Sequence, residues 1–86
     1  MQSEKRCYKT GVTFALDRHH AMNGPFRNKA DKYGLWVYLN HDIHIWLHNT
    51  RDGKKYERTL KQDAQKAFEE KYSHELWMSE FRRNYL

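Results

Sequence analysis

The sequence predicts a small α+β domain in which a two-stranded hairpin precedes several helices. Two short runs, residues 11–16 and 35–39, are rich in strand-favouring residues. Beyond them the apolar residues recur at helical spacing instead. The chain has 86 residues and no repeat or long linker, so we expect one domain over residues 1–86. Its hairpin-and-helix core should span about 12–50 and its C-terminal helical part about 55–86.

The first half of the chain is expected to place a pair of histidines on a strand. The run over residues 11–16 leads directly toward His19 and His20. Residues 22–34 contain an Asn-Gly-Pro turn sequence and no sustained apolar period, which predicts an ordered loop crossing over the histidines. The run over residues 35–39 should then pair antiparallel with the first strand.

The residues after the second strand fit a helix with two distinct faces. Ile43, Trp46 and Leu47 follow an i, i+3, i+4 pattern that is typical of a packing face. His44 and His48 are spaced i, i+4 and fall on another face. This helix should therefore pack on one side and present imidazoles on the other.

Two further helices are expected toward the C-terminus. The Thr-Arg-Asp-Gly sequence at residues 50–53 should end the preceding helix. The longer of the two helices has an apolar stripe formed by Leu60, Ala64, Ala67 and Phe68. Ser73 is a candidate N-cap for the last helix. We assign the Trp77 and Phe81 side chains of that helix to the core rather than to a ligand site.

Composition limits the compartment and the kinds of partner. The net charge is +5 with all histidines neutral, which suits a polyanion such as nucleic acid, although a solvated surface that leans basic is equally compatible with it. Cys7 is the only cysteine, so neither an intrachain disulfide nor a Cys₄ zinc site is possible. No segment has the apolar length of a membrane span or signal sequence. We therefore expect a cytoplasmic protein without membrane contact.

The two histidine pairs together predict a metal site. Imidazole is a good ligand for first-row divalent ions, and His44 and His48 at i, i+4 spacing would point at one ion. Adjacent strand residues face opposite sides, so one of His19 and His20 can bind the ion while the other faces a substrate as a general base. His41 is a weaker competitor on the same helical face. Each pair alone is more often a surface feature, but the two in this order favour a site.

Several segments of the chain resemble the HNH, or ββα-metal, nuclease family. The matching segments are Leu-Asp-Arg-His-His at 16–20, the Asn-Gly turn at 23–24, Lys-Tyr-Gly-Leu at 32–35, and His44 with His48. The chain is similar in particular to small phage-type HNH proteins, and this similarity covers nearly its whole length. The histidine spacing also resembles that of the nuclease colicins.

The resemblance implies a ββα-metal fold and a metal-dependent endonuclease that hydrolyses DNA. His19, His44 and His48 would be the ligands of one divalent ion, namely Mg²⁺, Mn²⁺, Ni²⁺ or Zn²⁺. His20 would be the general base. The implied setting is the cytoplasm of a bacterial host that carries a phage or prophage.

The chain departs from the family pattern at the structural zinc site and at the middle asparagine. Many members hold a structural zinc at sites that correspond here to Cys7, Thr10, Asn40 and Ile43. Because only the cysteine remains, we expect no structural zinc and a fold held by packing. The family's middle asparagine, which orients the base, falls near Gly34 or Leu35.

The basic residues around the histidines are candidate contacts for phosphate groups. They are Arg18, Arg27, Lys29 and Lys32. The arginines are favoured because a guanidinium can bind phosphate with two hydrogen bonds, whereas lysines at such positions are often only solvated. Two other functions stay open: a catalytically relaxed protein on the same scaffold that binds DNA or inhibits a host defence protein, and a metal-stabilised structural domain. No heptad pattern indicates an oligomeric state.

Overall fold

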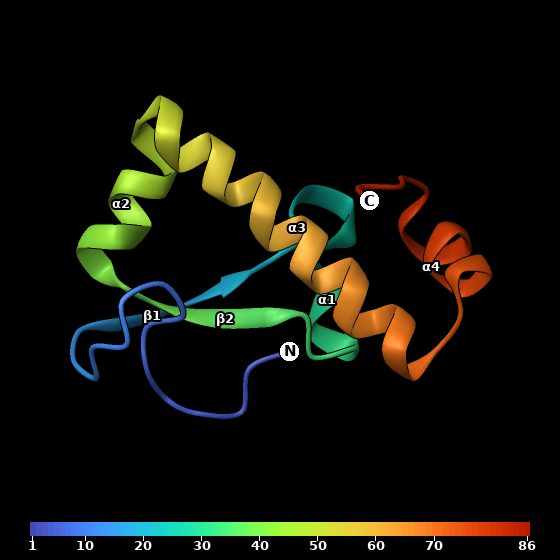
Figure 1. Cartoon of the computed structure of the whole chain (residues 1–86), viewed down its shortest axis with the longest axis horizontal. Helices are drawn as coiled ribbons and strands as arrows, with labels where there is room; N and C mark the ends of the chain where they lie inside the picture. Colours follow the sequence, from blue (N-terminus) through green and yellow to red (C-terminus); the bar gives the residue numbers. More distant parts are fainter.

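The computed structural model describes residues 1–86 and has the predicted α+β class (Figure 1). Its elements are β1 (Leu16–His20), the 3₁₀ turn η1 (Gly24–Phe26), α1 (Arg27–Lys32), β2 (Trp36–Asn40), α2 (His41–Asn49), α3 (Arg51–Lys71) and α4 (His74–Phe81). None of these helices has both the length and the apolar character needed to cross a membrane.

The two strands form an antiparallel hairpin in which Leu16 pairs with Asn40 and His20 with Trp36. The second strand lies within one residue of its prediction. The first strand was predicted too early, because it begins at Leu16 and itself contains both histidines. Ala15 has a φ of +50°, a left-handed conformation that interrupts the extended chain just before the strand.

The connection between the strands was predicted to be a loop, and this prediction was wrong. It contains η1 and the short helix α1. Ala30 is the only buried residue of α1, which explains why the segment shows no apolar period. A residue beyond the helix stabilises it, since the Leu35 amide donates a hydrogen bond to the Ala30 carbonyl. The turn predicted at Asn23-Gly24 is present, with Gly24 at a φ of +61°.

The helix α2 has the predicted extent and begins at a side-chain cap. The Asn40 side chain accepts a hydrogen bond from the Asp42 amide and donates one to the Phe14 carbonyl. This residue therefore joins the start of α2 to the chain that enters β1. Leu47 is fully buried, as its position on the predicted packing face requires.

The junction between α2 and α3 is a single residue. Thr50 follows α2, and its hydroxyl accepts from the Gly53 amide to cap α3. Gly53 thus lies in the first turn of α3, and this helix begins earlier than predicted. A Cβ atom at Gly53 would lie 2.2 Å from the Trp46 carbonyl oxygen of α2. The two helices are therefore in direct backbone contact.

The core consists of two adjoining clusters of buried side chains. One lies between the hairpin, α2 and α3 and contains Cys7, Val37, Leu39, Leu47 and Leu60. The other joins α1, α3 and α4, and its largest members are Phe68, Trp77 and Phe81. The predicted core roles of the α4 aromatics are confirmed, as is the Ser73 cap, whose hydroxyl accepts from the Leu76 amide.

Cys7 is enclosed by protein and is only 1% exposed. Burial raises the pKa of its thiol, but hydrogen bonds from the backbone of Asn40 and from Thr10 outweigh burial and lower this pKa below its ordinary value. Thr10 and Asn40 thus lie against the cysteine and contact its sulfur. Packing and these hydrogen bonds connect the N-terminal segment to the hairpin.

Candidate metal centre

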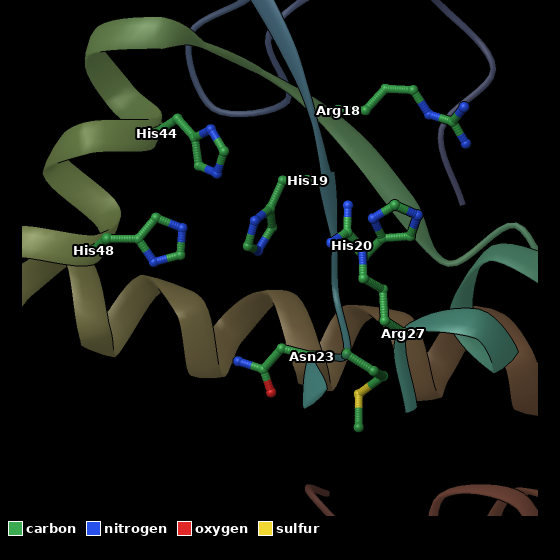
Figure 2. A pocket seen from close by; sticks show the side chains of 8 residues that line it. Arg18, His19, His20, Asn23, Arg27, His44 and His48 are labelled. Carbon is green, nitrogen blue, oxygen red and sulfur yellow. The ribbon is translucent and has the colours of Figure 1, made fainter. Parts of the chain in front are cut away.

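Three histidines from two elements converge on one point. His19 projects from β1 toward His44 and His48 on α2, as Figure 2 shows. The His19 ring centre lies 5.3 Å from that of His44 and 5.7 Å from that of His48. One ring nitrogen from each residue lies within 4.8 Å of the others, a spacing at which the three residues could hold a metal ion.

The chemistry of His19 fits a divalent ion. Its Nε2 atom is buried and has no hydrogen-bond partner, which is costly for a polar atom unless a ligand satisfies it. Burial, followed by the nearby imidazoles of His44 and His48, lowers the pKa of His19 from 6.5 to about 4. The ring is therefore neutral near pH 7, the state that can donate a lone pair to a metal.

Asp17 forms a hydrogen bond with a histidine of the cluster, and the sequence interpretation missed this residue. Its Oδ2 atom lies 3.1 Å from Nδ1 of His44 and 2.8 Å from Nδ1 of His41. Hydrogen bonds from His41 and His44 hold the pKa of this carboxyl below its usual value. When Nδ1 of His44 donates to Asp17, its Nε2 keeps the lone pair that a metal ligand needs. Strand alternation could have indicated Asp17 from the sequence, because Asp17 and His19 share one face of β1.

We expect Asp17→Asn to weaken Zn²⁺ or Co²⁺ binding by roughly 10- to 100-fold, the usual effect of losing a carboxylate that orients a ligating imidazole. Isothermal titration calorimetry would measure the affinity. Asp52→Asn is the matched control, since Asp52 is an exposed carboxylate in the first turn of α3. Equal affinities for the two variants would contradict an orienting role for Asp17.

His20 lies on the other side of β1 from the three-histidine cluster (Figure 2). Its Nε2 atom is 3.2 Å from Oδ1 of Asp31 on α1, and the Arg18 guanidinium donates to the same oxygen at 3.0 Å. Arg18 in turn stacks on the Trp36 ring at 4.2 Å. A carboxylate, an arginine and an aromatic ring thus fix the environment of His20. Asp31 gave no signal in the sequence, because the helix that carries it was not predicted.

A cavity of about 220 Å³ brings most of the predicted site residues together. Its lining consists of Arg18, His19, His20, Met22, Asn23, Arg27, His44 and His48. Lys29 and Lys32 do not line it. The Lys29 ammonium donates to the Glu80 carbonyl and pairs with the Glu80 carboxylate at 3.3 Å. The Lys32 ammonium lies 5.2 Å from the Tyr33 ring centre.

The fold and the site define a small α+β protein with a three-histidine site that could hold a metal ion and a fourth histidine in the same cavity. Comparisons with protein-family models, with curated protein sequences and with solved structures give no match.

Proposed function

We propose that this protein is an HNH-type, metal-dependent endonuclease that hydrolyses DNA phosphodiester bonds. The observation that carries the proposal is the buried, unpartnered Nε2 atom of His19, whose ring lies beside those of His44 and His48. A fourth imidazole, that of His20, lies in the same cavity on the opposite side of the strand. A metal site and a separate proton acceptor are the two components that one-metal phosphodiester hydrolysis requires.

In this proposal His20 acts as the general base. If its Nε2–H donates to Asp31, the lone pair is on Nδ1, and that atom accepts a proton from the attacking water. The Asp31 carboxylate holds the ring in this tautomer and stabilises the imidazolium that forms. This arrangement supplies the orientation that the family's middle asparagine would otherwise give.

The cationic side chains of the cavity position the phosphate. Arg18 and Arg27 line the cavity beside His20, where their guanidinium groups can donate to non-bridging phosphate oxygens. Arg18 is held by Asp31 and Trp36, so less side-chain entropy is lost when a phosphate binds. A divalent ion held by His19, His44 and His48 would polarise the phosphate and offset the negative charge of the transition state.

The test is nicking of supercoiled plasmid by purified protein in EDTA and in Mg²⁺, Mn²⁺, Ni²⁺ or Zn²⁺. We expect nicking with at least one ion and none in EDTA. The double variant His44→Ala/His48→Ala should lose both nicking and calorimetric Zn²⁺ binding, because it removes two of the three ligands. His41→Ala is the control, since this exposed histidine contacts Asp17 but is not in the cluster.

Two results would overturn the proposal. One is nicking that is equally fast in EDTA. The other is the absence of nicking with every ion, from wild-type protein whose circular dichroism and thermal melting show that it is folded.

A further inference from the structure

A second hollow with basic walls lies at the junction of α2 and α3, and the proposed reaction does not use it. This groove has a volume of about 680 Å³. It is lined by His48, Asn49, Thr50, Arg51, Lys54, Lys55 and Arg58, with no hydrophobic and no acidic residue among them. The two arginines and two lysines of the groove are all exposed. None of them lies within salt-bridge distance of a carboxylate.

The spacing of these cations places them on one face of α3. Arg51, Lys54, Lys55 and Arg58 follow an i, i+3, i+4, i+7 pattern. Like charges at i, i+4 repel each other, so this face is electrostatically unfavourable in the free protein. Binding of a polyanion removes that repulsion and releases counterions. The face spans about 10 Å along the helix.

The groove shares a lining residue with the cavity of the candidate metal centre. His48 lines both the groove and the smaller cavity that contains His19 and His20. Figure 2 shows His48 at the end of α2 that adjoins α3. The first turn of α3 also faces this junction, and a helix N-terminus adds partial positive charge. A strand whose phosphate lies in the cavity therefore has a charged path that leads past His48 onto α3.

We propose that this groove, with Arg51, Lys54, Lys55 and Arg58 as its contacts, binds the backbone phosphates of the DNA strand next to the phosphate that is cut. The position of the groove relative to the cut phosphate rests on the proposed function, but its affinity for DNA does not. The groove reads charge and spacing and makes no base-specific contact, so binding is independent of sequence.

The experiment measures fluorescence anisotropy of labelled duplex DNA over a series of salt concentrations. All proteins carry His20→Ala to prevent cleavage. Lys54→Gln/Lys55→Gln is compared with Lys66→Gln/Lys71→Gln, which removes two exposed lysines of the same helix outside the groove. We expect the groove pair to raise Kd at least about 10-fold and to lower the salt slope by about one per lysine, while the control pair keeps the parental slope.

Equal salt slopes and equal DNA affinities for the two pairs would contradict the proposal that the groove binds DNA. Thermal melting and Zn²⁺ affinity of each variant show whether the fold and the metal centre are intact. The two proposals can fail separately. If the wild type never nicks DNA but the groove pair loses DNA binding, the proposed nuclease activity is wrong and the proposed DNA-binding groove is supported. If the wild type nicks DNA but the groove pair binds DNA like the control pair, only the proposed DNA-binding groove is wrong.

Discussion

Replacing His20 with alanine is expected to slow plasmid nicking by roughly 10²- to 10⁴-fold, the usual contribution of a general base. The substitution should leave metal binding intact, because the three clustered imidazoles lie on the other side of β1. Initial nicking rates at saturating metal, together with calorimetric Zn²⁺ titration of the same preparation, measure the two properties separately. A large loss of rate at constant metal affinity assigns the proton transfer to His20.

His74→Ala is the control for this experiment. That histidine is exposed, pairs with Glu69 at 3.0 Å and does not line the cavity. A His20→Ala protein that nicks as fast as His74→Ala would contradict the role of His20 as the base. If the wild type also fails to nick DNA yet binds it tightly, the same scaffold is better described as a DNA-binding protein.

The metal-free protein is expected to lose about 3 kcal/mol of unfolding free energy between pH 6.5 and pH 4 because of His19. Burial lowers the pKa of this group from 6.5 to about 4 in the folded protein. In that window the unfolded chain binds the proton and the folded chain does not, so unfolding is favoured as the pH falls. This contribution is complete above pH 6.5 and is lost as the pH falls toward about 4. Urea denaturation in EDTA at several pH values measures it.

His19→Gln should remove most of the pH dependence in this window. The carboxyls of Asp17 and Glu69 also have lowered pKa values, so their contributions are lost at more acidic pH. An NMR titration of the wild-type imidazoles provides a second measurement that does not depend on how well the variant folds. A His19 ring that titrates near pH 6.5 would contradict the expected burial effect.

The part of the site that could be predicted depends on local geometry. His44 and His48 are four residues apart on a helix, and His19 follows the alternation of a strand. Each of these directions is set by the backbone of a single element. Antiparallel pairing then leads β2 directly into α2, so His19 on the strand meets His44 and His48 on the helix without a long connection.

The part that could not be predicted depends on α1. Its one buried residue, Ala30, gives no apolar period, and the helix is stabilised by neighbours such as the Leu35 amide. The positions of Asp31 beside His20 and of Lys29 beside Glu80 both follow from this helix. A carboxylate therefore occupies a place for which the sequence suggested no side chain, and a predicted phosphate contact turns away from the cavity.

The basic groove could not be predicted for a related reason. The residues from Arg51 to Arg58 have helical spacing, but their relation to His48 depends on how α2 and α3 meet. That arrangement is set by the Thr50 cap and by the close contact at Gly53. Both are tertiary features that composition and periodicity do not report.

Gly53 determines how closely α2 and α3 can approach each other. Any side chain at this position would push against the backbone of Trp46 and Leu47, and no shift of a flexible side chain could relieve that contact. The two helices would have to move apart, which would change the position of His48 relative to the cations of α3. The absence of one carbon atom at Gly53 thus fixes how far His48 lies from the cations of α3, and neither can move without the other.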